Sequence, residues 1–415
     1  MAFRVVGILF VAALIGLVSW AVLSAVSDSQ EQNTRQSELD PFYTPPDSIP
    51  DDPGAVVRTE PMDVDVKGGS AERILYVSER ADGEPAVSSG MIFIPEKKAP
   101  KGGRPVVAWS HGTLGMGEAC VPSRSENPTE AMSTWIGPMM QQGWVVVATD
   151  YVGLGTPGPN QYAIAQAEVR DVVNSVRAAR NIPAAKASER YVTYGHSQGG
   201  HSSIWTGHLG PEYAPELDLL AVSAAAPALN LLPIADAQWD TAVGWVIGSD
   251  LIESWPTYYP DLPVDSVLTP LGGDLTQRLT AECVETAGLE ALVLEKAGQQ
   301  FFSENPTKVG PWSDALKAQT PQPLPRKMPV FIAQGTADEI VLPWPNAIVQ
   351  QQWCKADSDL TMLWLGGVKH VPAAKVAGPS VVEWIAGRFD NSPTEPNCSF
   401  PAPISTQPGP NPSLL

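Results

Sequence analysis

The chain has 415 residues and a formal net charge of −19, from 26 Lys and Arg against 45 Asp and Glu. Because it contains no long basic run, binding to nucleic acid or to anionic lipid is excluded as its main function. The length suffices for one large α/β domain with an insertion. Four cysteines allow two disulfides, in three possible pairings.

The N-terminal part carries a predominantly apolar, uncharged segment of 22 residues, Val5 to Val26. That length can span a bilayer, whereas a signal peptide has a shorter apolar core and a better cleavage site than Ala25-Val26-Ser27. Arg4 before the segment and acidic residues after it place the N-terminus inside and the rest outside. We expect residues 1–27 to be a membrane anchor or a signal peptide, with the anchor favoured. The protein is then secreted or held on the outer face of the cytoplasmic membrane.

Residues 28–60 are acidic and proline-containing, which predicts a linker. After it, strand-like apolar runs alternate with helical patterns, so the predicted fold class is α/β, with a mainly parallel sheet and helices on both faces. Such sheets bind their ligands at the carboxyl ends of the strands. The predicted strands are 73–78, 88–94, 105–110, 144–149, 191–194 and 219–225, and the predicted helices are 128–142, 162–180 and a stretch ending near Leu209.

The pentapeptide Gly195-His196-Ser197-Gln198-Gly199 lies between a strand-like run and a stretch that can be helical. This is the layout of a nucleophile elbow, in which the serine takes a strained backbone conformation and the glycines let strand and helix pack closely. The pentapeptide alone is weak evidence, since chance supplies roughly 0.2 matches in a chain of this composition. Ser197 is therefore a candidate nucleophile whose assignment depends on its context.

An elbow serine needs a base and an acid, which follow it in the order Ser, Asp or Glu, His. Of the five histidines, only His370 lies far downstream of Ser197, in a loop after a strand-like run. The acid is expected after the preceding strand, 329–334, where Asp338 is the first choice and Glu339 the adjacent alternative. Either carboxylate could instead cap the helix that follows.

Acyl transfer also requires backbone donors for an oxyanion. The N–H of Gln198, the residue after the nucleophile, is the first candidate. The second is the N–H of Thr113, with Gly112 as the alternative, because Ser110-His111-Gly112-Thr113 follows an early central strand. For His111 we expect a structural hydrogen bond within that loop.

Together these segments resemble the secretory lipase family of α/β-hydrolases, over residues 60 to 400. The resemblance implies that Ser197, Asp338 and His370 form a catalytic triad and that a mostly helical cap covers an acyl site. It also implies the disulfides Cys120–Cys283 and Cys354–Cys398. The matching pieces are Ser110-His111-Gly112-Thr113, Ala148 to Gly155, Gly195 to Gly200, Gly335-Thr336-Ala337-Asp338 with Val341 and Pro343, and His370.

The strand and helix alternation stops between about residues 227 and 325, where the chain is rich in Trp, Tyr and Phe. We expect a cap there, with the aromatic residues as its core or as part of an acyl pocket. The expected domain order is a hydrolase core over 61–226, the cap over 227–325, the rest of the core over 326–390 and a proline-rich tail over 391–415.

These patterns predict a serine carboxylic-ester hydrolase, a lipase or esterase, which acts on acyl esters or lipids without a cofactor. Within the same fold a peptidase or amidase is the main alternative, and an inert surface binding protein is another. A metallohydrolase would need His196, His201 and His208, whose spacing matches no standard zinc motif, so no metal site is expected.

Overall fold

The computed structural model of the protein describes residues 34–409, which belong to two compact units, Met1–Thr44 and Pro45–Leu415. In the first unit residues 34–43 are helical. The apolar segment Val5 to Val26 lies outside the described residues. Within the described part of the chain, no helix has both the length and the hydropathy required to cross a bilayer.

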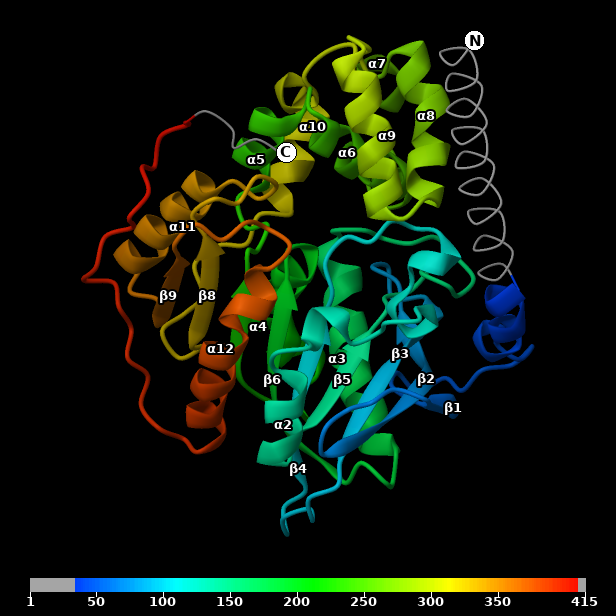
Figure 1. Cartoon of the computed structure of the whole chain (residues 1–415), viewed down its shortest axis with the longest axis vertical. Coiled ribbons are helices and arrows are strands. Elements are labelled where there is room, and N and C mark those ends of the chain that lie inside the picture. The colour runs from blue at the N-terminus through cyan, green and yellow to red at the C-terminus, as the bar shows by residue number, and fades with distance from the viewer. Residues whose placement is uncertain (1–33, 410–415) are drawn as a thin grey trace, which may run out of the picture. The chain divides into compact units, whose positions relative to one another are not determined.

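The second unit is built on a nine-stranded sheet with the order β1-β2-β3-β5-β4-β6-β7-β8-β9 (Figure 1). Strands β1 to β3 are antiparallel to their neighbours, and β3 is antiparallel to β5. All other adjacent strands are parallel. The predicted α/β fold with a mostly parallel sheet is confirmed. The strands are β1 (Val56–Met62), β2 (Gly69–Glu79), β3 (Pro85–Pro95), β4 (Arg104–Ser110), β5 (Val145–Thr149), β6 (Ala187–His196), β7 (Asp218–Ala225), β8 (Val330–Gly335) and β9 (Leu360–Leu365).

Helices cover both faces of this sheet. On one face, α2 (Ile136–Gln142) and α12 (Ala373–Phe389) share an apolar cluster with alternate strand residues such as Val107. On the other, α3 (Ala165–Asn181) packs with the intervening residues, such as Val106. Strands buried on both faces appear in sequence as continuous apolar runs. The helices α4 (Gln198–Tyr213) and α11 (Pro343–Lys355) pack with β7 to β9 in a further cluster.

Two boundaries differ from the sequence prediction. The prediction of a linker up to residue 60 is wrong at its end, because β1 begins at Val56 and pairs with β2. As an edge strand with no buried residue, β1 has no apolar run to reveal it. The helix predicted from residue 162 begins at Ala165, since Ala163 has a φ of 52°, outside the helical region.

Between β7 and β8 the chain leaves the sheet and forms the α5–α10 segment, which lies beyond one end of the strands (Figure 1). The segment has its own apolar core, which includes Trp245, Trp255 and Trp312. The Cys120–Cys283 disulfide joins it to the loop after β4. Two backbone hydrogen bonds, Val284 N–H to Leu114 O at 2.9 Å and Met116 N–H to Thr280 O at 2.8 Å, lie beside this bridge. The helices of the α5–α10 segment are α5 (Leu231–Gln238), α6 (Ala242–Ser254), α7 (Val264–Val267), α8 (Pro270–Ala281), α9 (Val284–Lys296) and α10 (Gly310–Ala318).

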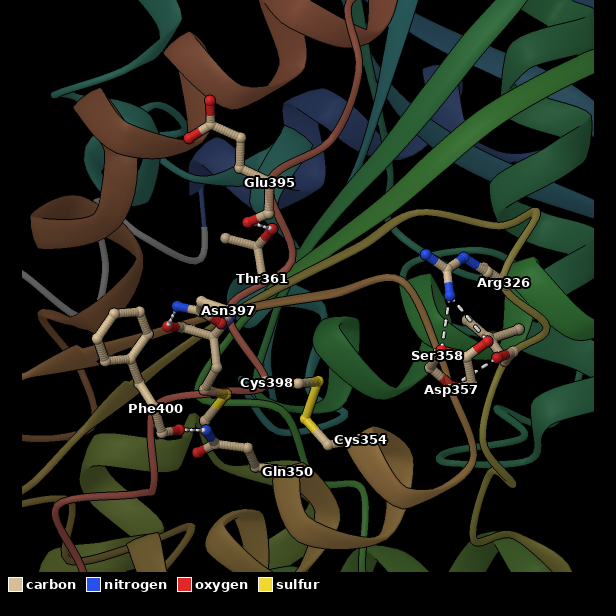
Figure 2. Close-up of a disulfide and its surroundings, with 12 residues drawn as sticks. Arg326, Gln350, Cys354, Asp357, Ser358, Thr361, Glu395, Asn397, Cys398 and Phe400 are labelled. Carbon is tan, nitrogen blue, oxygen red and sulfur yellow. Dashed lines mark hydrogen bonds and ion pairs between the residues drawn. A yellow bond between two sulfur atoms is a disulfide. The ribbon is translucent and has the colours of Figure 1, made fainter.

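The C-terminal tail covers the sheet edge at β9 (Figure 2). The N–H of Asn397 donates to Leu360 O at 3.1 Å. The Asn397 side-chain amide donates to Met362 O at 2.7 Å, and its side-chain oxygen accepts from Met362 N–H at 2.8 Å. The side chain therefore pairs with β9 as the peptide group of a further strand would. The Cys354–Cys398 disulfide fixes this part of the tail to α11, which protects an edge that could otherwise pair with other chains.

Replacing Asn397 with Ala should lower the free energy of unfolding by about 1–2 kcal/mol, because two hydrogen bonds to β9 are lost. It should also increase aggregation on heating. Denaturant unfolding and light scattering measure the two effects. Ser399→Ala, an exposed position in the same tail, is the control. An Asn397→Ala protein that unfolds and scatters light like the wild type would rule out this role.

Candidate active site

The turn between β6 and α4 holds Ser197 in a backbone conformation that non-glycine residues rarely adopt, with φ 56° and ψ −118°. The glycines around it are required by packing. A Cβ at Gly195 would lie 1.9 Å from the carbonyl oxygen of Gly199, and a Cβ at Gly199 would lie 1.9 Å from that of Ser110. The turn therefore has the geometry predicted for a nucleophile elbow.

The structure brings Ser197, His370 and Asp338 together. Nε2 of His370 lies 2.9 Å from Oγ of Ser197, and its Nδ1 lies 2.9 Å from Oδ2 of Asp338. The three residues are 8%, 4% and 0% exposed. Both ring nitrogens of the histidine thus have a partner of the type that nucleophilic catalysis requires.

The carboxylate of Asp338 is fixed from several sides. Its Oδ1 accepts the backbone N–H groups of Ile340 and Val341 at 3.0 and 2.9 Å. Its Oδ2 accepts a hydrogen bond from the side-chain amide of Gln334 at 3.0 Å in addition to that from His370. These donors orient the acid toward the imidazole.

Glu339, the alternative acid, makes a different contact. Its Oε2 accepts the backbone N–H of His370 at 3.2 Å, and its Oε1 lies 3.8 Å from Nζ of Lys369. Its own carbonyl accepts from the side-chain amide of Gln238 in α5 at 2.9 Å. Glu339 therefore holds the main chain of the histidine, while Asp338 holds the ring.

The two predicted oxyanion donors border the same pocket as Ser197. Among residues 34–409, neither the N–H of Gln198 nor that of Thr113 donates to a protein acceptor. A Cβ at Gly112 would lie 3.2 Å from Cβ of Ser197, so this loop passes directly against the nucleophile. Both amides are available to a ligand atom bound beside Ser197.

The other histidines contact separate groups. Among the described residues, no group of three or more His, Cys, Asp or Glu side chains is arranged to hold a metal ion. The ring of His111 lies 2.7 Å from Gly112 O within its own loop, that of His196 3.1 Å from His370 O, that of His201 2.7 Å from Gln319 O, and that of His208 2.8 Å from Gln322 O.

The sequence model of the secretory lipases matches residues 124–397. The chain belongs to the secretory lipase family. The chain is 25% identical to Lipase 5 of Candida albicans in an alignment of 389 residues, which covers 86% of this chain and 82% of the relative. It is 22% identical to a probable inactive lipase of Mycobacterium tuberculosis, over 85% and 82% of the two chains. Among solved structures, Candida antarctica lipase A in its closed state has the same fold, with a TM-score of 0.69 and 19% identity over 89% of this chain and 91% of that one.

In this secretory lipase family member, Ser197 opens onto a mostly apolar pocket. The pocket contains about 1050 Å³ of empty space, including its opening. Much of its wall comes from α5 and α6 and includes Leu231, Ile234, Ile247 and Leu251. This lining suits an extended hydrocarbon group.

Two residues of this lipase-family site were not predicted from the sequence. His196 donates through Nε2 to the carbonyl of His370 at 3.1 Å, and the two rings lie 4.8 Å apart. Glu168 is 2% exposed, and its Oε1 accepts from the side-chain amide of Gln198 at 2.7 Å. Nothing in the sequence marks either role, since His196 occupies the variable position of the elbow and Glu168 lies on a distant helix.

The environment of His196 gives a pH prediction for this lipase-family protein. Burial, followed by the neighbouring His370, lowers the pKa of His196 from 6.5 to about 3. Such a histidine binds its proton only after unfolding, so its contribution to stability is present above the unfolded pKa and is lost as the pH falls toward the folded one.

His196→Gln, which keeps a side-chain N–H donor, should therefore lose less stability than the wild type between about pH 7 and pH 5. Urea unfolding of both proteins across this range measures the difference. An equal fall in the free energy of unfolding of the two proteins between about pH 7 and pH 5 would contradict a neutral His196 in the folded state.

Proposed function

We propose that the protein hydrolyses carboxylic esters with an apolar acyl group through an acyl-enzyme on Ser197. The observation that carries this proposal is the hydrogen-bonded series Ser197, His370 and Asp338 at a strained elbow, beside a mostly apolar pocket. Membership of the secretory lipase family supports the reaction class.

In the proposed reaction, Oγ of Ser197 attacks the ester carbonyl while Nε2 of His370 takes its proton. Asp338 fixes the ring and stabilises the imidazolium. The tetrahedral intermediate collapses, His370 gives the proton to the departing alcohol, and the acyl group remains on Ser197. Water then attacks the acyl-enzyme in the same way and releases the carboxylic acid.

The negative charge on the intermediate is proposed to be stabilised by the N–H groups of Gln198 and Thr113. Both are unpaired within the described protein and border the pocket beside Ser197. They can therefore receive the oxyanion without first breaking a protein hydrogen bond, which is the property that makes preorganised donors effective.

The α5–α10 segment is proposed to act as a cap over the acyl group, because its first two helices form much of the pocket wall. The apolar lining favours an ester with a hydrocarbon acyl chain over a peptide, whose backbone would need hydrogen-bonding partners. The two disulfides and the secretory family favour action outside the cytoplasm.

Ser197→Ala should lower kcat for p-nitrophenyl esters by about 10⁴-fold or more while the protein stays folded. Only an activated serine reacts with a fluorophosphonate probe, so labelling of the wild type and its loss in Ser197→Ala provide a second measurement. If the wild type neither hydrolysed esters from C2 to C16 nor reacted with the probe, the protein would be an inert member of the family. Activity that survives the substitution would place the nucleophile elsewhere.

Asp338→Asn should lower kcat by about 10³–10⁴-fold, because the amide no longer selects the reactive tautomer of His370. The neighbouring Glu339→Gln is the matched control and should cost less than about tenfold, since its oxygen can still accept the backbone N–H of His370. Steady-state kinetics of the two variants compare the acids directly. A larger loss in Glu339→Gln would exchange their roles.

A further inference from the structure

Thr113 lines the pocket and carries a side-chain hydroxyl in addition to its backbone amide. Its Oγ1 lies 2.6 Å from the hydroxyl of Tyr162, and both residues line the pocket together with Ser197 and Gln198. Tyr162 is 7% exposed. A close pair of hydroxyl groups therefore borders the place where the ester carbonyl would be attacked.

Either hydroxyl can be the donor of this hydrogen bond. Burial, with a further contribution from Asp250, raises the pKa of Tyr162, so the phenol keeps its proton. Among residues 34–409, Thr113 Oγ1 is the one acceptor within hydrogen-bond distance of that phenol. The phenol can therefore donate to Oγ1 of Thr113. In that arrangement the proton of the threonine has no other protein acceptor in the described chain and can point into the pocket.

Tyr162 is held firmly enough to orient its partner. Its carbonyl accepts from the indole N–H of Trp255 at 3.0 Å. The next residue, Ala163, has a φ of 52°, and its N–H donates to Oε1 of Glu168 at 2.8 Å. Strained backbone of this kind persists only where its surroundings fix it. The same Oε1 accepts the side-chain amide of Gln198, so one carboxylate connects the Tyr162 turn with the nucleophile elbow.

We propose that the hydroxyl of Thr113 is a third donor to the oxyanion, beside the two amides, and that Tyr162 positions and polarises it. The inference rests on the proposed acyl-enzyme mechanism. Thr113 is the catalytic residue, since its proton contacts the reacting oxygen. Tyr162 is a positioning residue that acts through Thr113, because a hydroxyl that accepts a hydrogen bond becomes a better donor.

The test compares Thr113→Val, Thr113→Ser and Tyr162→Phe in the full protein with a p-nitrophenyl ester. All three keep the backbone amide at position 113, so only side-chain donors change. Thr113→Val should lower kcat by about 10–100-fold and leave KM within about twofold, since the lost interaction forms in the transition state. Thr113→Ser should restore at least about a third of the wild-type kcat.

Tyr162→Phe should lower kcat by about 3–10-fold alone and have no further effect in Thr113→Val, because it acts through the same hydroxyl. Thermal unfolding checks that each variant is folded.

Three results would overturn the inference. The first is a kcat of Thr113→Val within about twofold of the wild type, and the second is an equal loss of kcat in Thr113→Ser and Thr113→Val. The third is a loss of kcat on Tyr162→Phe that is as large in the Thr113→Val background as in the wild type. Failure of the proposed function is seen separately, as hydrolysis that survives Ser197→Ala.

Discussion

The site depends on how closely the first turn of α4 approaches the ends of β4 and β6. Only glycine at positions 195 and 199 permits this approach. It places Ser197 in a conformation that costs about 1–3 kcal/mol, which the packing of two strands and a helix must offset. The same approach brings the loop after β4 against the serine. The proposed nucleophile and the proposed oxyanion donors are thus positioned by one steric constraint.

The remaining contacts of the site position His370, the proposed base. Asp338 orients the imidazole of His370. The backbone N–H of His370 donates to Glu339, and its backbone carbonyl accepts a hydrogen bond from His196. These contacts come from the loop after β8 and from the elbow itself. A loop histidine would otherwise sample several ring positions, and each lost contact would reduce the fraction of molecules ready to react.

The sequence was informative where chemistry restricts residue type and order. The position after a strand pointed to Asp338 and Glu339, with Asp338 as the first choice. In the structure Asp338 contacts the ring of His370 and Glu339 its backbone N–H. Glu168 and Tyr162 could not be found in this way, because their roles arise from the packing of α3 against α4 and from a left-handed residue at Ala163. Strand β1 was missed for another reason: an exposed edge strand leaves no hydrophobic pattern.

The bridge between Cys120 and Cys283, with its two adjacent backbone hydrogen bonds, has a mechanical consequence. It ties the junction of α8 and α9 to the stretch of chain that begins one residue after Thr113. The α5–α10 segment therefore cannot separate from the core as a rigid body without pulling on the loop that carries Thr113. Any opening of this segment that leaves the loop in place has to pivot about the tethered end. In the proposed enzyme, the entry of substrate and the position of Thr113 would therefore be linked through one covalent connection.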